Sequence, residues 1–260
     1  MIQLSTLIVA LATAGLVAMA AHALRLLTAS GAVAAALVGA AAMIGGYEWV
    51  VLLLFFFASS SALSHWRAAE RERRVGSLIG KAGRRDAIQV LANGGVFGLA
   101  AVLSGVTGSP SWHAIGIGAI AAATADTWST EIGTVLGGTP RMIFGWRQVA
   151  PGTSGGITIA GSVAAVVAAL LASLVAGSVH WDTPMRAVAA GGIAGSLVDS
   201  VLGATVQERR WCPDCSTPTE RRIHSCGTTT LHRGGIRGCD NDTVNLITTI
   251  AGAVVTWTLT

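Results

Sequence analysis

Long apolar runs, separated by short polar or charged stretches, follow one another along nearly the whole chain. A helix that crosses a bilayer needs roughly 20 predominantly apolar residues. Seven runs meet this length or come close, and an eighth closes the sequence; they predict spans over 3–24, 31–46, 49–65, 87–107, 112–134, 157–179, 185–206 and 243–260. The run 31–46 is short and ends at Gly45-Gly46, so it indicates either a tilted span or a re-entrant hairpin.

Composition supports the same class of protein. Hydrophobic residues make up 52% of the chain and charged residues only 12%, about half the charge of an ordinary soluble domain. The 33 glycines and many alanines lie largely inside the apolar runs, where small side chains allow close helix packing. This excludes a typical soluble enzyme, a disordered chain and a secreted disulfide scaffold. It predicts an all-α, polytopic transmembrane bundle of seven or eight spans, a single membrane domain over 1–260.

Basic residues predict how the bundle is oriented. Lysine and arginine favour the cytoplasmic side of a membrane, and here they gather in the loops 66–86 (which includes Lys81), 135–156 and 207–241. Two predicted spans separate each loop from the next, so all three lie on one side, together with Arg25. Of the 17 lysines and arginines, only Arg186 is predicted on the other side of the membrane. We expect a cell-membrane protein with these loops in the cytoplasm and both termini outside.

Three acidic residues lie inside predicted spans, where a charged side chain is costly and therefore a candidate for function. Asp126, Glu131 and Asp199 all fall toward the cytoplasmic ends of their helices. Asp126 and Glu131 are five residues apart, about 140° around a helix, so either the helix loosens near Gly133 or the two acids face different partners. Carboxylates at one depth are suitable ligands for Mg²⁺.

Amides from other spans reach the same depth: Asn93, Gln207, Asn241 and Asn245. On the seventh span, every fourth residue from 191 to 207 is a glycine, Asp199 or Gln207, which places the set Gly191, Gly195, Asp199, Gly203 and Gln207 on one helix face. Intramembrane amides and hydroxyls also serve simply to join helices, and we favour that role for Gln89 and Thr248.

A glycine-rich loop precedes the sixth span, with the sequence Val-Ala-Pro-Gly-Thr-Ser-Gly-Gly over residues 149–156. Its glycines can turn backbone N–H groups toward an anion, and the following helix N-terminus adds a favourable dipole. A plain turn is the alternative interpretation. Beside the three acids, we predict a phosphate-binding loop whose residues are Gly152, Thr153, Ser154, Gly155 and Gly156, with Arg84, Arg85, Arg141 and Arg147 as nearby basic candidates.

The loop 207–241, between the last two spans, holds all four cysteines. Cys212 and Cys215 have the two-residue spacing typical of zinc ligands, and His224 and Cys226 complete a candidate structural Zn²⁺ site. Cys239 or His232 are alternatives to the histidine. Unmetallated thiols and a disulfide also remain open, although cytoplasmic thiols stay reduced.

Taken together, the motifs of residues 66–260 resemble the integral-membrane family that includes transmembrane protein 19 and the plant phytyl-phosphate kinase. The stretches that carry the resemblance are Ala125-Asp126-Thr127-Trp128-Ser129-Thr130-Glu131-Ile132-Gly133, Pro151 to Gly156, Gly195 to Gln207, Cys212-Pro-Asp-Cys215 with His224-Ser-Cys226-Gly227, Asn241-Asp-Thr-Val-Asn245 and Gln89 to Gly94.

This resemblance implies a membrane-embedded kinase that converts an isoprenyl monophosphate, phytyl or geranylgeranyl-like, to the diphosphate. The acid and glycine motifs are similar to those of a wider group of CTP-using lipid enzymes, which implies CTP as the donor and Mg²⁺ as the cofactor. Asp126, Glu131 and Asp199 would then hold or orient Mg²⁺, and the glycine loop and amides would bind nucleotide and phosphate groups. Prenyl monophosphate and the bilayer are the other expected partners, and nucleic acid is not.

Three other functions fit parts of the pattern. A cytidylyltransferase that forms a CDP-lipid would use the same Mg²⁺ site. An ion-coupled transporter also carries intramembrane acids, although here they gather at one end and no inverted repeat is visible. A scaffold without catalysis would need only the polar seams.

Overall fold

The structure of the protein is a computed structural model that describes residues 3–76, 78 and 83–260; Lys81 lies outside this range. Eight long helices occupy the eight predicted spans, each within a few residues, which confirms their positions. They are α1 (Leu4–Ala23), α2 (Ala29–Gly45), α3 (Tyr47–His65), α5 (Ala87–Thr107), α6 (Ser111–Leu136), α7 (Ile159–Ser178), α8 (Met185–Thr205) and α9 (Asn241–Thr258).

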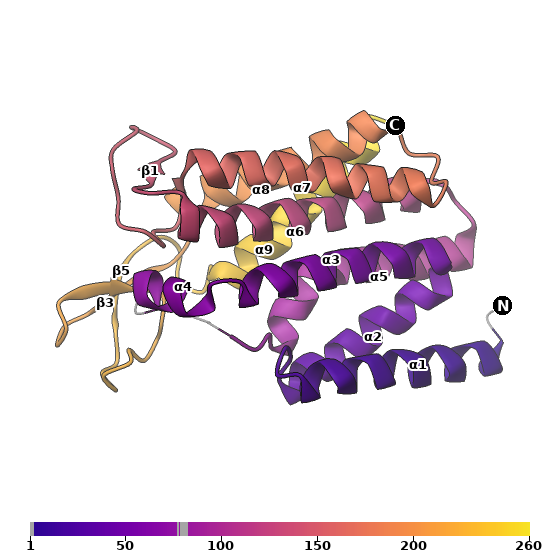
Figure 1. Ribbon diagram of the computed structural model, residues 1–260, viewed down its shortest axis with the longest axis horizontal. Coiled ribbons are helices and arrows are strands. Elements are labelled where there is room, and N and C mark those ends of the chain that lie inside the picture. The colour runs from indigo at the N-terminus through magenta and orange to yellow at the C-terminus, as the bar shows by residue number, and fades with distance from the viewer. Residues whose placement is uncertain (1–2, 77, 79–82) are drawn as a thin grey trace.

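The long helices run up and down in one elongated bundle (Figure 1), and both chain termini lie at the same end. The opposite end carries a short helix, α4 (Ala68–Val75), and the five strands of the described residues; we call it the sheet end. The loops rich in arginine all lie there, whereas Arg186 opens α8 at the other end. The predicted segregation of basic residues is therefore confirmed for the described part of the chain.

Among the described residues, five helices are long and apolar enough to cross a membrane: α1, α3, α5, α7 and α8. Helix α2 has 17 residues and is continuous up to Gly46, whose φ of 129° turns the chain into α3. Figure 1 shows α2 inclined to its neighbours, so the segment is a tilted helix rather than a re-entrant hairpin. Helices α6 and α9 are not among these five; α6 is enclosed over residues 116–125, whereas α9 leaves Leu246, Ile250 and Val254 exposed.

Helix α6 forms the centre of the bundle and packs against α3, α5, α7, α8 and α9. Its residues 116–125 are all buried and are mostly alanine and glycine, so the neighbouring backbones approach closely. The glycine stripe of α8 has the predicted role. A methyl group at Gly191 would collide with Thr256 of α9, and one at Gly195 with Ala122 of α6.

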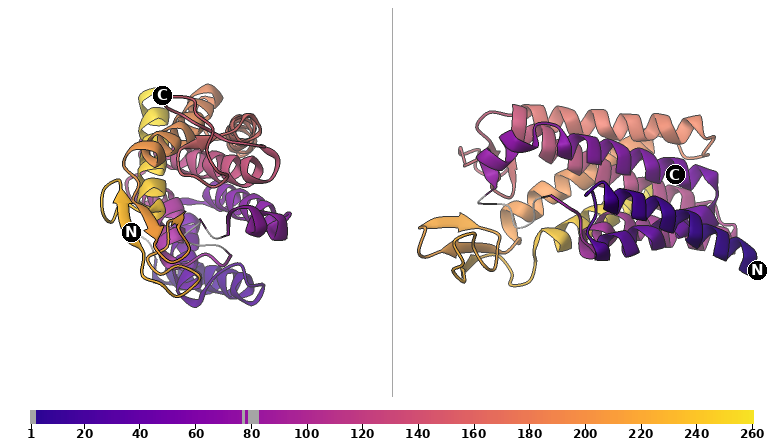
Figure 2. Two further views of the ribbon diagram at one scale, coloured as in Figure 1. Left: turned by 90° about the vertical axis from the view of Figure 1, so that its left-hand side faces the viewer. Right: turned by 60° about the horizontal axis from the view of Figure 1, so that its bottom comes forward.

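Helix α1 lies outside this core, whereas α2 packs on α5. Helix α1 packs on α2 and buries only Ala10, Ala14, Ala18 and Ala21, at helical spacing. Figure 2 shows α1 and α2 to one side of the remaining helices. Most of the surface of α1 is therefore left for lipid.

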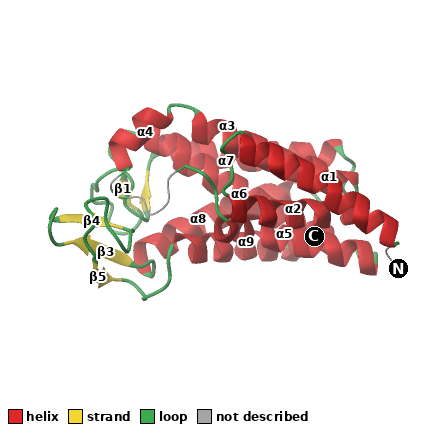
Figure 3. Ribbon diagram, turned by 90° about the horizontal axis from the view of Figure 1, so that it is seen from below, coloured by secondary structure: helices red, strands yellow, loops and turns green. Residues whose placement is uncertain are grey.

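The sheet end holds two small antiparallel sheets that the sequence did not predict. Strand β1 (Arg141–Met142) pairs with β2 (Gly156–Ile157), and a three-stranded sheet has the order β4 (Thr217–Thr219), β3 (Arg209–Cys212), β5 (Leu231–Gly234). The predicted loop 207–241 thus contains a small sheet (Figure 3). We refer to residues 207–240 as the sheet module.

Candidate functional site

A cavity of about 760 Å³ begins at the sheet end and continues between α1, α2, α3 and α5. All the predicted acids, amides and glycine-loop residues line it: Asn93, Asp126, Glu131, Gly152, Thr153, Ser154, Gly155, Gly156, Asp199, Gln207, Asn241 and Asn245. The predicted convergence of separate helices on one site is therefore seen in the structure. The roles of the individual residues remain predictions.

Asp126 of α6 and Asp199 of α8 form the centre of the polar end. Both are half-buried, and their carboxyl groups lie against each other. The hydroxyl of Thr248 on α9 donates to Asp199 Oδ1 at 3.4 Å, which confirms Thr248 as a link between helices. Two adjacent carboxylates repel unless a proton or a cation lies between them. Their hard oxygen atoms match the ligand preference of Mg²⁺.

Glu131 faces different partners. Its Oε1 accepts a 2.7 Å hydrogen bond from Ser64 of α3, and its Oε2 pairs with Arg71 of α4. Helix α6 stays regular from Ser111 to Leu136 and does not loosen near Gly133. Of the two predicted alternatives, the one in which Asp126 and Glu131 face different partners is therefore correct. Glu131 therefore holds the guanidinium group of Arg71 at the cavity wall, away from the aspartate pair.

The glycine-rich loop is largely bonded to the protein itself. The N–H and hydroxyl of Thr153 donate to Ala150 O at 3.1 and 2.7 Å, and Gly156 N donates to Thr153 O at 2.9 Å. Helix α7 begins only at Ile159, after its own cap, Thr158. The side chain of Thr153 is thus engaged within the loop, and a phosphate would be met by the remaining N–H groups.

Gly155 fastens this loop to α8. Its φ is +77°, a conformation that costs an L-residue roughly 1–2 kcal/mol, and a Cβ there would collide with Ala204. From the other side, a Cβ at Gly203 would lie 2.7 Å from Gly155 N. The glycines let the loop rest directly on the helix that carries Asp199.

Gly155→Ala is therefore expected to destabilise the protein more than Gly138→Ala. Gly138 has a similar φ of +66° with nothing near its missing Cβ, so its substitution reports backbone strain alone, about 1 kcal/mol. Gly155→Ala adds the collision, and we expect about 2 kcal/mol or more. Thermal unfolding of both variants in detergent tests this. Equal losses would contradict a tight contact between loop and α8.

Glu220, after β4, joins three segments and was not predicted. Its Oε1 accepts hydrogen bonds from Ser154 of the glycine loop at 2.7 Å and from Gln207 at 2.9 Å. Its N–H donates to Leu78 O at 2.9 Å. Gln207 and Ser154 thus meet through a carboxylate that also lines the cavity. No motif surrounds Glu220, so only the fold could identify it.

Basic residues surround the polar end, and most differ from those predicted. Arg71, Arg85, Arg210, Arg221 and Arg222 line the cavity. Burial, and then the charge of Arg71, lower the pKa of Arg85 to about 10. Both guanidinium groups therefore remain charged at neutral pH, and a bound anion would reduce the repulsion between them.

Arg84 and Arg141 have structural contacts instead. Arg84 Nε donates to Leu27 O at 3.0 Å, and Arg141 Nη1 to Trp146 O at 2.9 Å. Of the four arginines proposed from the sequence, only Arg85 lines the cavity.

The amides occupy two helices at the rim. Asn93 Nδ2 donates to Gln89 O at 3.0 Å, one turn earlier on α5. Gln89 forms a capping box with Asp86 at the start of that helix, a structural role within α5 rather than the expected link to another helix. Asn241 and Asn245 begin α9, whose N-cap is Asp240.

Beyond the polar end the cavity becomes an apolar arm. It is lined by Ala14, Val17, Ala18 and Ala21 of α1, Val38, Gly39, Ala42 and Met43 of α2, and Val50, Leu53, Leu54 and Phe57 of α3. Along α3 the whole cavity extends from Ser64 at the polar end to Val50 in the arm, roughly 21 Å at 1.5 Å per residue. Val17 and Leu54 are 52% and 47% exposed, so the arm is open toward the surrounding lipid.

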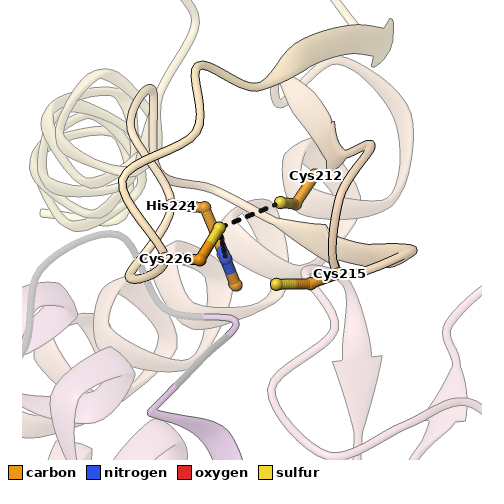
Figure 4. A group of neighbouring side chains, drawn as sticks. All are labelled: Cys212, Cys215, His224 and Cys226. Atoms are coloured by element: carbon orange, nitrogen blue, oxygen red, sulfur yellow. Dashed lines mark hydrogen bonds between the residues drawn. The ribbon is translucent and has the colours of Figure 1, made fainter.

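The sheet module brings together the four predicted metal ligands (Figure 4): Cys212, Cys215, His224 and Cys226. Their ligand atoms all lie within 4.8 Å of one another. The four cysteines of the chain are free thiols, which does not support the disulfide alternative. Cys239 and His232 are not members of this group.

These features define the class of protein: a polytopic membrane protein whose helices enclose a cavity that is polar at one end and apolar at the other. The sequence matches the family model described as integral membrane protein DUF92 over residues 12–253. The chain belongs to this family, as its motifs predicted.

Two relatives illustrate the breadth of the family. The chain is 30% identical over 217 residues to Protein PGR of Arabidopsis thaliana, which covers 72% of this chain and 73% of that protein. It is 34% identical over 173 residues to the uncharacterized membrane protein MJ0933 of Methanocaldococcus jannaschii, covering 66% and 60%. No solved structure shows significant similarity to the chain.

Proposed function

We propose that the protein is a membrane-embedded kinase that phosphorylates an isoprenyl monophosphate to the diphosphate, with CTP as the preferred donor. The observation that carries this proposal is the two-part cavity. One end gathers a carboxylate pair, arginines and a glycine-rich loop, and the other continues as an apolar arm open to lipid. Such a cavity matches a substrate with an anionic head and a long hydrocarbon tail.

The polar end supports a division of roles. Asp126 and Asp199 would hold Mg²⁺, which usually binds one or two carboxylates together with substrate phosphates. When bound, the ion would neutralise charge on the transferring phosphoryl group. Arg71, fixed by Glu131, and Arg85 would bind the phosphate of the lipid at the entrance of the arm. The glycine loop and the amides of α9 would bind the nucleotide.

The chemistry needs no strong base. An oxygen of the prenyl monophosphate, already anionic, attacks the γ-phosphorus of the nucleotide. The bond from that phosphorus to the β–γ bridging oxygen breaks, and the nucleoside diphosphate leaves with its electron pair. Such transfers depend on positioning and charge neutralisation more than on covalent catalysis. The half-buried acids and the arginines that line the cavity would supply both.

The orientation follows from the same proposal. The sheet end carries nearly all the basic residues, which favour the cytoplasm, and nucleotides are cytoplasmic. We therefore place the polar end at the cytoplasmic face of the cell membrane and both termini outside.

The direct test is an assay of detergent-purified protein with Mg²⁺, a C20 prenyl monophosphate, and CTP or ATP in separate reactions. We expect prenyl diphosphate and a nucleoside diphosphate, with CTP as the better donor. A CDP-lipid with release of pyrophosphate would identify a cytidylyltransferase instead. Absence of any product from folded protein with either nucleotide would contradict an enzyme of this kind.

A further inference from the structure

The cysteine cluster lies in the sheet module, outside the membrane helices. Cys212 ends β3 and is buried, while Cys215 lies in the turn before β4. His224 and Cys226 lie in the connection between β4 and β5. The Sγ atoms of Cys212 and Cys226 are 3.6 Å apart, and His224 Nδ1 is 3.2 Å from Cys226 Sγ. Figure 4 shows all four side chains converging on one point.

Three thiols and an imidazole in this arrangement are ligands for one particular class of metal. Sulfur and imidazole nitrogen at tetrahedral sites favour zinc over the hard cations that bind carboxylates. Four protein ligands leave no open position, so such a site is structural and not catalytic. This site is chemically and spatially separate from the aspartate pair, and it does not depend on the proposed kinase activity.

The metal ligands flank a segment of the chain that contributes to the cavity. Cys215 and His224 bracket residues 216–223, which include β4 and the cavity residues Glu220, Arg221 and Arg222. This segment reaches back to the membrane domain: Glu220 N donates to Leu78 O, and Arg221 Nη2 donates to Gly76 O, both at 2.9 Å.

Besides the cluster, the sheet module holds that segment through β4 and through Thr230, whose N–H donates to Arg222 O and whose hydroxyl donates to Arg221 O. Strand β4 has three residues, paired on one side with β3. Among the described residues of the module, only a few side chains are buried, Cys212 among them. A module with so small a core commonly depends on a metal for its fold.

We propose that Cys212, Cys215, His224 and Cys226 bind one structural zinc ion, and that this ion positions the segment 216–223 so that Glu220 closes the polar end of the cavity. The zinc acts on the cavity only through this segment. Its loss releases Glu220 from Ser154 and Gln207 while the helix bundle stays folded.

The test compares Cys215→Ser with Cys239→Ser, a matched substitution of the cysteine outside the cluster. Elemental analysis of the purified, tag-free proteins is expected to show about one zinc per chain in the unsubstituted protein and in Cys239→Ser, and almost none in Cys215→Ser. Hydrogen exchange of residues 217–222 is expected to accelerate at least tenfold in Cys215→Ser alone, with the exchange of α6 and α8 unchanged.

A zinc-release experiment on the unsubstituted protein tests the same proposal even where the Cys215→Ser variant does not fold. Zinc released from the unsubstituted protein by a thiol-blocking mercurial, followed with a metal-sensitive dye, should appear at about one equivalent, and exchange of 217–222 should accelerate in the same sample. Protein that has been freed of zinc and then of the mercurial by excess thiol, but does not take up added zinc, overturns the site, as does equal zinc in both variants. Zinc release with no change in the exchange of 217–222 overturns its positioning role.

Discussion

Replacing Asp126 or Asp199 by asparagine is expected to lower the turnover of prenyl monophosphate by about 10³-fold or more, since each change removes a ligand charge for Mg²⁺ at the site of transfer. The two carboxyl groups lie against each other in the cavity. Removing one of them therefore also relieves repulsion. We expect the melting temperature in detergent to stay the same or to rise while activity is lost.

Asp182→Asn is the matched control for this pair of variants. Asp182 is exposed in the connection between α7 and α8, at the end of the bundle opposite the sheet end. Its substitution should change neither turnover nor melting temperature. An Asp126→Asn or Asp199→Asn protein with nearly full activity would exclude that carboxylate from the mechanism. A parallel fall of stability and activity would indicate a structural pair instead.

The sequence predicted the bundle well because a bilayer imposes a strong and simple pattern. Each apolar run became a helix near the predicted bounds, and the arginine-rich loops all lie at one end of the bundle, as the positive-inside pattern predicts. The convergence of Asp126, Asp199 and Thr248 could also be predicted, because polar side chains at one depth of a membrane pair with one another rather than face lipid. The glycine stripe of α8 followed from helical spacing alone.

The features that were missed depend on contacts that no periodic pattern encodes. Helix α4 lies in a charged segment and is held partly by Arg71 with Glu131, so it could not be recognised by apolar spacing. Glu220 reaches the cavity only because the sheet module folds back onto the bundle. Arg141 was proposed for phosphate binding by its place in the chain, yet its guanidinium donates to Trp146 O within the hairpin.

The apolar arm gives the second large prediction, which concerns the lipid tail. Val17 of α1 and Leu54 of α3 line the arm and are also 52% and 47% exposed to the membrane. Val17→Trp would therefore fill part of the arm without displacing a buried side chain. A C20 tail that loses contact there forfeits about 2 kcal/mol, the burial of two to three methylene groups. We expect kcat/KM for the C20 monophosphate to fall about thirty-fold.

A five-carbon prenyl monophosphate separates this effect from damage to the polar end. Val17 lies roughly 9 Å along α1 from the helix end nearest the phosphate site, at 1.5 Å per residue, so a five-carbon tail does not reach it. Turnover of the short substrate should be unchanged in Val17→Trp, and Leu54→Trp should behave in the same way. Leu16 is the neighbouring residue on α1, exposed to lipid at 64% and not among the residues that line the arm, so Leu16→Trp should leave both substrates unaffected. Equal losses for the short and long substrates would mean that the tail lies elsewhere, whereas a selective loss for the long one would assign the arm to the tail and make its length a determinant of specificity.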